Sequence, residues 1–484
     1  MKIYITGLPS GYEVEHLVRL FYPMAPLTLT APEDGEDCVW AEKKPDGLWA
    51  MVRERGKSKT ARALLPDIET PEFALASLTY DLLRAWTGIR PPWGKMTGVR
   101  PVRLVHDKRA AGWSEAEIDR FFLGRFDCSE QKYRMAKAIA DLQEPILRLG
   151  SEPKTYSLYL GIPFCPSRCS YCSFVSCNLD RDRKLVQPYV DCLCREVEAI
   201  REEADKAGLK LCSIYIGGGT PTSLSAAQLR QLMGTVRDCF DLSALVEYTV
   251  EAGRPDCTDA EKLAVIKEYG ATRISINPQT FSDEVLTNIG RKHSAQDILD
   301  CYADARRAGH DDINMDLIAG LPGDTVEGFE HSLRQAIALD PENITVHTLT
   351  LKRASRIVIE DQKENDYADV AAMLEKCHLL AEAGYRPYYL YRQKNTLQNL
   401  ENVGWCKPGH EGYYNIYIME EVQTILSAGA GGSTKLVADG GKRMQRIFNF
   451  KYPTEYIQRF AEVLERKKGV ADFYDHDLGP ETVG

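Results

Sequence analysis

Strand and helix patterns alternate regularly after residue 154, and this alternation constrains the fold more than any other feature of the chain. The expected strands are Ser157–Ile162, Leu211–Ile216, Glu247–Glu251, Arg273–Asn277, Ile313–Ile318 and Ile344–Thr348, and the expected helices are Leu185–Lys206, Ala226–Cys239, Asp259–Glu268, Ser294–Ala308, Val326–Leu339 and Tyr367–Ala383. Such alternation predicts an α/β fold with parallel strands joined by right-handed helical crossovers. Both a partial (β/α)6 barrel and an open doubly wound sheet fit it. Both architectures place the chemistry at the carboxyl ends of the strands.

Residues 1–150 have a different pattern and predict a separate N-terminal α+β domain. Short strands are expected within Met1–Thr6 and Asp37–Val52, the second stretch with a turn at Pro45–Gly47. Apolar residues at three- and four-residue spacing predict helices at Pro71–Trp86, Ser114–Leu123 and Glu130–Leu149. The basic stretch Gly88–Leu104 is expected to be a solvated loop, with an anion-binding loop as the alternative.

The expected domains are therefore residues 1–150, a barrel at 151–395 and a C-terminal extension at 396–484 that completes the active site. The chain has 60 basic and 70 acidic residues, and this net charge of −10 gives no sign of a nucleic-acid partner. Its first residues lack the features of a signal peptide, and no stretch is apolar for long enough to span a bilayer. We expect a cytoplasmic protein without a membrane span, whose 14 cysteines are mostly reduced.

Three cysteines lie close together in Cys165-Pro-Ser-Arg-Cys169-Ser-Tyr-Cys172, directly after a strand-like run. Closely spaced thiolates are typical ligands of iron–sulfur clusters. A cubane holds four irons, so three cysteines leave one iron open to bind a small molecule. Zinc sites typically have four ligands in paired spacings. The motif predicts a [4Fe–4S] cluster, with unrelated buried thiols or an incomplete zinc site as the alternatives.

Glycines and polar residues fall at the ends of the other expected strands. The run Gly217–Thr222 reads Gly-Gly-Gly-Thr-Pro-Thr, and glycines let the backbone approach a ligand closely. Glu251 ends the next strand, and Asp316 lies inside an apolar strand, where an ionised carboxylate needs a partner. We expect that partner to be Arg291, either directly or through a cofactor. Each residue alone fits a structural ion pair equally well, but their joint position predicts a cofactor site.

These motifs together resemble the radical S-adenosylmethionine (SAM) superfamily and, within it, the coproporphyrinogen III dehydrogenases of oxygen-independent haem biosynthesis, of the HemZ type. The resemblance spans roughly residues 155–435 and implies the partial (β/α)6 TIM-like barrel, with a [4Fe–4S] cluster and SAM as cofactors. The implied cluster ligands are Cys165, Cys169 and Cys172, and the implied SAM contacts are Tyr159, Tyr171, Gly218, Gly219, Thr220, Glu251, Gln279, Arg291, Asp316 and Thr350. Tyr159 and Glu251 are also expected to be catalytic.

The family resemblance implies that two propionates of coproporphyrinogen III are oxidatively decarboxylated to vinyl groups, which gives protoporphyrinogen IX. It also implies a low-potential electron donor of the flavodoxin or ferredoxin class. A tetrapyrrole rich in carboxylates needs cationic clamps, and we expect Arg392 and Lys394 to take this role. Two positions depart from the family pattern, because Gly161 and Phe174 stand where oxidases often carry a histidine and a fourth cysteine.

Two other functions share these motifs. Related haem chaperones carry a His-Asn-x-x-Tyr-Trp signature, but this chain has Tyr414 in place of the histidine, with His410 nearby. A tyrosine can also bind haem iron, so Tyr414 keeps the chaperone open as an alternative. A radical SAM methyltransferase that opens haem is the third candidate, and only its products would distinguish it from the decarboxylase.

Overall fold

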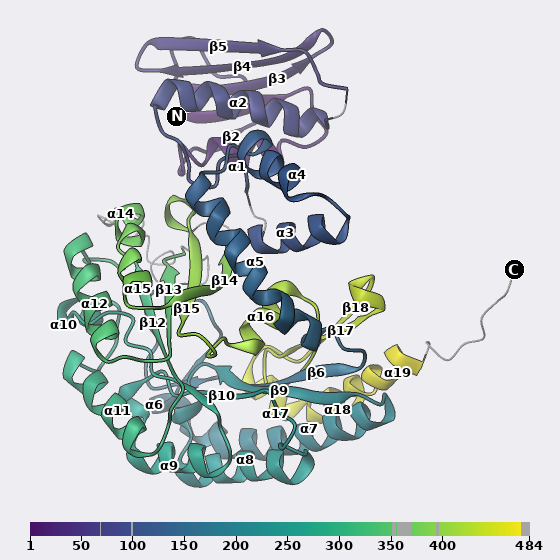
Figure 1. Cartoon of the computed structure of the whole chain (residues 1–484), viewed down its shortest axis with the longest axis vertical. Coiled ribbons are helices and arrows are strands. Elements are labelled where there is room, and N and C mark those ends of the chain that lie inside the picture. Colours follow the sequence, from purple (N-terminus) through teal and green to yellow (C-terminus); the bar gives the residue numbers. More distant parts are fainter. Residues whose placement is uncertain (68, 98–99, 351–354, 356–368, 394–395, 476–484) are drawn as a thin grey trace, which may run out of the picture. The chain divides into compact units, whose positions relative to one another are not determined.

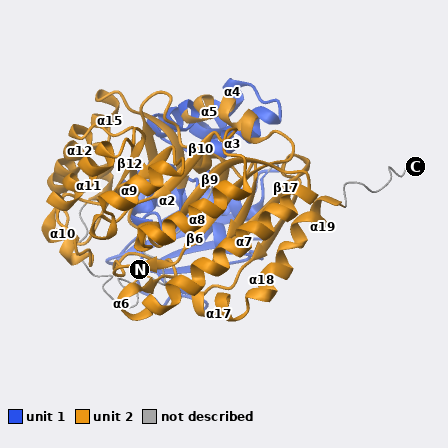
Figure 2. Ribbon diagram, turned by 90° about the horizontal axis from the view of Figure 1, so that it is seen from below, with its two compact units in different colours: residues 1–138, 392–400 blue, residues 139–391, 401–484 orange. Residues whose placement is uncertain are grey.

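Six parallel strands in the order β6-β9-β10-β11-β12-β13 form the centre of the fold in this computed structural model (Figure 1). The structure describes residues 1–67, 69–97, 100–350, 355, 369–393 and 396–475. The chain forms two compact units, residues 1–138 with 392–400 and residues 139–391 with 401–484 (Figure 2).

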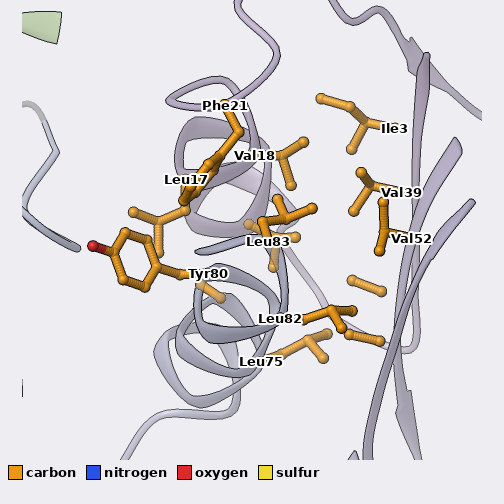
Figure 3. Close-up of a cluster of buried hydrophobic side chains, with 14 of the residues drawn as sticks. Ile3, Leu17, Val18, Phe21, Val39, Val52, Leu75, Tyr80, Leu82 and Leu83 are labelled. Atoms are coloured by element: carbon orange, nitrogen blue, oxygen red, sulfur yellow. The ribbon is translucent and has the colours of Figure 1, made fainter. Parts of the chain in front are cut away.

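The first unit contains a five-stranded sheet in the order β2-β1-β3-β4-β5. Its elements are β1 (Lys2–Thr6), α1 (Tyr12–Val18), β2 (Leu27–Thr28), β3 (Cys38–Lys44), β4 (Gly47–Glu54), β5 (Lys57–Ala63), α2 (Pro71–Thr87), α3 (Pro101–Ala110) and α4 (Glu115–Asp119), followed by a π-helical turn at Arg120–Arg125. Helices α1 and α2 cover one face of the sheet, and side chains such as Val18, Leu83 and Val39 form the core between them (Figure 3). The turn expected at Pro45–Gly47 is confirmed, because Lys44 pairs with Gly47 across the β3–β4 hairpin.

The expectation of a loop over Gly88–Leu104 is wrong in its last part. Helix α3 begins at Pro101, whose fixed φ suits the first helical position. Two cations of this stretch form ion pairs: Arg90 lies 2.9 Å from Asp127, and Lys95 lies 3.0 Å from Asp81. These pairs account for both charges without a bound anion.

The second unit contains the expected strand and helix alternation. Its elements up to the sixth parallel strand are β6 (Thr155–Ile162), β7 (Phe164–Cys165), β8 (Cys177–Asn178), α6 (Leu179–Asp182), α7 (Val186–Lys206), β9 (Lys210–Gly218), α8 (Ala226–Cys239), β10 (Glu247–Glu251), α9 (Ala260–Glu268), β11 (Arg273–Ser275), α10 (Asp283–Asn288), α11 (Ala295–Arg307), β12 (Ile313–Ala319), α12 (Val326–Ala338) and β13 (Asn343–Thr348). Helices follow the strands and cover their outer side (Figure 1). The parallel order confirms the partial (β/α)6 barrel and excludes the doubly wound sheet, whose strand order reverses midway.

The rest of the second unit extends the same sheet on both sides. Its elements are α5 (Glu130–Gly150), which begins in the first unit, α14 (Val370–Glu375), α15 (His378–Glu382), β14 (Arg386–Arg392), β15 (Glu401–Cys406), α16 (Tyr413–Glu420), β16 (Thr424–Ala428), β17 (Ser433–Ala438), β18 (Arg443–Phe448), α17 (Pro453–Gln458), α18 (Phe460–Lys467) and α19 (Gly469–Asp475). Strand β16 pairs parallel with β6, and β15 pairs antiparallel with β13. Two short helices replace the described part of the single helix expected over Tyr367–Ala383.

The C-terminal strands β16, β17 and β18 belong to the same sheet as the barrel strands. A buried ion pair joins the C-terminal segment to α7, because Lys467 Nζ lies 2.8 Å from Glu196 Oε1. Glu196 Oε2 also accepts hydrogen bonds from the backbone N–H of Gly429 and from Tyr456 Oη. Whether the three predicted domains fold independently stays a prediction. Within the described residues, no helix has both the length and the apolar character needed to cross a membrane.

Candidate functional site

The six parallel strands have one apolar face and one polar face, because successive side chains point to opposite sides. The apolar face packs against the helices and includes Leu158, Leu160, Ile214, Ile216, Val250, Ile274, Met315, Leu317, Ile344 and Val346, which are at most 1% exposed. The polar face carries Ser157, Tyr159, Ser213, Tyr215, Glu247, Thr249, Glu251, Arg273, Ser275, Asn314, Asp316, Asn343, Thr345 and His347. Packed barrels usually fill their interior with bulky apolar side chains. A polar interior therefore indicates a site for a polar ligand.

The three motif cysteines lie in one loop at the carboxyl end of the barrel. Cys165 ends β7, and Cys169 and Cys172 follow before β8, with the backbone N–H of Cys172 donating to the carbonyl of Cys169. Burial raises the pKa of Cys165 and Cys172, and the neighbouring Cys169 raises both pKa values further. The three sulfur atoms thus lie within range of one another's charge. Without a metal, this environment favours the protonated thiols, so an incoming metal must displace protons.

The glycine run brings the end of β9 against this loop. Gly218 has a φ of +109°, which a residue with a Cβ rarely adopts. A Cβ on Gly219 would lie 2.9 Å from Cys165 Sγ, which is closer than the two atoms can approach. The hydroxyl of Thr220 donates a hydrogen bond to the same sulfur atom at 3.5 Å. The predicted SAM contacts Gly218, Gly219 and Thr220 are therefore beside a predicted cluster ligand.

Arg291 reaches the same loop from the segment after α10. Its guanidinium donates to the carbonyl of Asn277 at 2.7 Å and to Tyr171 Oη at 3.2 Å. The side chain is buried, and its Nε has no hydrogen-bond partner among the described residues. No carboxylate in the described part of the chain forms an ion pair with it. A buried cation without a counter-ion is costly, so Arg291 marks a place for an anion.

Glu251 ends β10 and accepts a hydrogen bond of 2.5 Å from Tyr215 Oη of β9. Desolvation inside the barrel raises the pKa of Glu251 to about 7, and the nearby Asp316 adds to this effect, although the hydrogen bond from Tyr215 opposes it. A carboxyl group with this pKa can exist in either protonation state near neutral pH.

Asp316 on β12 obtains its partners from neighbouring positions. Asn314 Nδ2 donates to its Oδ1 at 2.8 Å, and His347 Nε2 lies 3.6 Å from its Oδ2. Burial acts to raise the pKa of Asp316, but His347 and Asn314 outweigh it and hold the pKa below its usual value. Tyr391 Oη contacts the other ring nitrogen of His347 at 3.2 Å. The direct pair expected between Asp316 and Arg291 is not formed, because His347 and Asn314 take its place.

Tyr159 belongs to a stack of three tyrosines in the barrel interior. Its ring centroid lies 6.2 Å from that of Tyr215 and 6.3 Å from that of Tyr414, and Tyr215 and Tyr414 are 4.5 Å apart. The stack connects β6 and β9 with α16. Gln279 lies just beyond β11 and has a φ of +68°, a strained conformation of the kind that often occurs at functional sites.

Thr350, Arg392 and Lys394 complete the set of predicted site residues. Thr350 lies just beyond β13, where its hydroxyl donates to the carbonyl of Thr348. Arg392 belongs to the first unit, is buried, and donates to the carbonyls of Met96 and Asn399. The role of Arg392 as a substrate clamp stays a prediction. Lys394 lies outside the described residues.

Sequence reasoning missed Arg254, His347, Tyr215 and Asn277. Arg254 follows Glu251 by three residues, and its guanidinium donates to Cys169 Sγ at 3.4 Å. Tyr215 and His347 lie on the polar faces of expected strands, so the period-two pattern gave a signal for both. No local signal shows that Arg254 reaches a cysteine 85 residues earlier.

The comparisons with known proteins agree with this geometry. The radical SAM superfamily matches residues 159–336. The oxygen-independent coproporphyrinogen-III oxidase-like protein HemZ of Bacillus subtilis is 41% identical over 397 residues, which are 80% of this chain and 78% of that protein. The chain belongs to this HemZ family of radical SAM proteins.

Members of other related groups are similar over shorter spans. The heme chaperone HemW of B. subtilis is 41% identical to this HemZ-family chain over 308 residues, 63% of this chain and 76% of that protein. Among solved structures, the coproporphyrinogen III oxidase HemN of Escherichia coli aligns with a TM-score of 0.52 at 24% identity, covering 70% of this chain and 74% of that one. The likeness to HemN confirms the fold.

The side chains at the carboxyl end fit the cofactors of this superfamily. Among the described residues, no three His, Cys, Asp or Glu side chains converge on one metal ion. The cysteines of one loop need not converge on a single ion to hold a cubane, because each cysteine binds a different iron. Two buried groups are available to bind SAM. Arg291 is a cation that no carboxylate among its described contacts neutralises, and Asn277 Oδ1 is an acceptor that receives no hydrogen bond in the described contacts. These two groups complement the carboxylate and the ammonium or hydroxyl groups of SAM.

Proposed function

We propose that this protein is a radical SAM enzyme that oxidatively decarboxylates propionate side chains of coproporphyrinogen III, giving protoporphyrinogen IX. Cys165, Cys169 and Cys172 would hold a [4Fe–4S] cluster, and the strand ends around them would hold SAM. When bound, these cofactors supply the one-electron chemistry that starts removal of a hydrogen atom from an unactivated carbon.

The buried guanidinium of Arg291 carries the cofactor part of this proposal. Arg291 contacts the loop that carries the three cysteines, because its guanidinium donates a hydrogen bond to Tyr171. No carboxylate is among its described contacts. A charge-assisted bond to the carboxylate of SAM would compensate this charge, and such bonds contribute about 1.5–3 kcal/mol. The unpaired guanidinium and the family membership both support the carboxylate of SAM as the anionic group at this place.

The chain's own residues would position SAM between the strand ends. A Cβ on Gly218 would lie 3.1 Å from the backbone of Ile162, and one on Gly219 would lie 2.9 Å from Cys165 Sγ, so the two glycines let β9 pass directly beside the cysteine loop. Glu251 is fixed by Tyr215, and Asp316 is fixed by Asn314 and His347, so both carboxyl groups are oriented before a ligand binds. Such orientation lowers the entropic cost of bringing reacting groups together.

The tetrapyrrole substrate is proposed from the family, because the relative HemZ is named an oxygen-independent coproporphyrinogen-III oxidase-like protein. Haem trafficking is the competing proposal, since HemW proteins are also related. Two contacts weigh against it. Tyr414 is buried and stacks on Tyr215, and the His410 ring faces Asp312 at 3.1 Å. Both side chains that could replace the missing haem ligand are therefore already engaged within the fold.

Anaerobic turnover tests the proposal. The reconstituted full-length protein is incubated with SAM, a low-potential reductant and coproporphyrinogen III, and the porphyrin products and 5′-deoxyadenosine are quantified. We expect protoporphyrinogen to form together with 5′-deoxyadenosine. SAM cleavage without decarboxylation would reject this substrate but retain the radical chemistry.

A haem titration of the same preparation distinguishes the alternatives. Stoichiometric haem binding that survives in a Tyr414→Phe variant, together with no decarboxylation, would favour a chaperone with another ligand. Conversion of the haem itself would identify a haem-modifying methyltransferase. Neither result is expected from the proposed decarboxylase.

A further inference from the structure

Arg254 is a buried arginine beside the cysteine loop that neither the motifs nor the proposed SAM contacts include. It follows β10 three residues after Glu251, and it is 4% exposed. One terminal nitrogen, Nη1, lies 3.4 Å from Cys169 Sγ and 3.4 Å from the carbonyl of Ser167. The other, Nη2, donates to Ser167 Oγ at 2.9 Å. Arg254 thus contacts the loop at a predicted cluster ligand and at a residue two positions before it.

Asp256 holds this guanidinium in a fixed orientation. Its two oxygens accept from Arg254 Nε at 2.8 Å and from Nη2 at 2.7 Å, so the pair is bidentate. The side chain of Asp256 is 14% exposed, and it also lies 3.6 Å from the buried ring of His293. With Nε and Nη2 fixed by the carboxylate, Nη1 points to the sulfur atom.

We propose that Arg254 is a positioning residue for the cluster, which donates a hydrogen bond to the sulfur of Cys169 and makes the reduction potential of the bound cluster more positive. This inference rests on the cluster of the proposed function but not on its substrate. Outer-shell hydrogen bonds and charges near cluster sulfurs are general determinants of cluster potential.

The sign of the effect follows from electrostatics. Reduction adds one negative charge to the cluster, and a donor with a positive charge at 3.4 Å from a ligand sulfur stabilises that added charge. The carboxylate of Asp256 lies on the far side of the guanidinium and opposes the effect in part. Removing the cation and removing the carboxylate must therefore shift the potential in opposite directions.

The test measures midpoint potentials of the reconstituted full-length protein by redox titration followed by electron paramagnetic resonance. We expect Arg254→Met to lower the equilibrium constant for reduction about tenfold, which corresponds to about 59 mV for one electron. Asp256→Asn should shift the potential in the positive direction, and Arg254→Lys should recover part of the loss. Arg230→Gln is the matched control, because Arg230 is an exposed arginine on α8 that pairs with Glu261.

An unchanged potential in Arg254→Met, or a shift of both variants in the same direction, would show that Arg254 only holds the loop and would overturn the inference. If Arg254→Met retains no iron, Asp256→Asn decides alone, since it keeps the guanidinium, and a negative or absent shift contradicts the proposal. A wild-type protein that assembles no cluster would overturn the proposed function and this inference together. A cluster without turnover of coproporphyrinogen would reject only the substrate.

Discussion

The two ends of the barrel interior each bury an arginine, and the two arginines have different partners. At the amino ends of the strands, Arg273 lies 3.2 Å from the carboxylate of Asp312 and donates to the carbonyl of His410. At the carboxyl ends, Arg291 contacts only backbone carbonyls and a tyrosine in the described part of the chain. Burial penalises both cations, so the difference in partners shows which charge the fold compensates and which it leaves for a ligand.

The largest effect is expected from Cys169→Ala at the carboxyl end. The variant should hold no intact [4Fe–4S] cluster and show no SAM cleavage, because one of three ligands is lost. Its thermal unfolding should stay close to that of the wild type, since the amino-end network is untouched. Iron content, electron paramagnetic resonance and 5′-deoxyadenosine formation measure these outcomes.

Cys192→Ala is the matched control for that variant, because Cys192 is a half-buried thiol on α7, away from the cysteine loop. It should retain both the cluster and the activity. A Cys169→Ala protein with an intact cluster would remove the basis for treating the carboxyl end as a cofactor site.

Arg273→Met should instead affect the fold. The substitution leaves Asp312 without its cation and removes the charge that offsets the burial of Glu247. Breaking a buried pair in this way costs about 3–5 kcal/mol in the free energy of unfolding. Urea denaturation measures the loss, with Arg237→Met, an exposed position on α8, as the control. A loss as small as that of the control would mean that the amino-end network does not stabilise the barrel.

The strong, regular patterns of the strands and helices predicted a parallel α/β sheet, and the family resemblance decided between the barrel and the doubly wound sheet. Apolar residues at alternate strand positions supply the helix-facing core, and Glu251 and Asp316 on the other face marked the interior. The cysteine loop and the glycine run were both expected to follow strands, and the carboxyl ends of parallel strands meet at one edge, which is where the structure places them.

Contacts between distant residues were beyond that reasoning. The partner of Asp316 was expected to be Arg291, directly or through a cofactor, and the direct partner is instead His347 on the neighbouring strand, while the link through a cofactor stays a prediction. Only the pairing of β12 with β13, with Asp316 opposite Thr345, places these side chains together. Arg392 was expected at the substrate because of its charge, and that role stays a prediction. What the sequence could not show is that its guanidinium donates to the carbonyls of Met96 and Asn399.

The protonation of Glu251 is expected to change the free energy of unfolding with pH, and this effect is intermediate in size. Its pKa is raised from 4.5 to about 7 in the folded protein, so the folded state keeps a proton that the unfolded chain releases above pH 4.5. The corresponding stability is fully present below pH 4.5 and is lost as the pH rises through about 7. The total change is about 3 kcal/mol, at 1.36 kcal/mol per pKa unit.

Urea unfolding across this pH range should show that loss of stability in the wild type and a flatter profile in Glu251→Gln. Glu268→Gln, at an exposed position on α9, should behave as the wild type. Equal pH profiles for wild type and Glu251→Gln would mean that Glu251 ionises normally and that the carboxyl end is as well solvated as the surface.

Arg291→Met gives the smallest effect and the most direct comparison of the two ends. Loss of one charge-assisted bond, worth about 1.5–3 kcal/mol, should weaken SAM binding about 10- to 150-fold. Without SAM, the free energy of unfolding should fall much less than in Arg273→Met, because no carboxylate among the described contacts loses its partner. Calorimetric SAM titration and urea unfolding of both variants measure the two quantities. If Arg291→Met lost as much stability as Arg273→Met and kept its SAM affinity, the two ends would be equivalent, and Arg291 would be a structural residue.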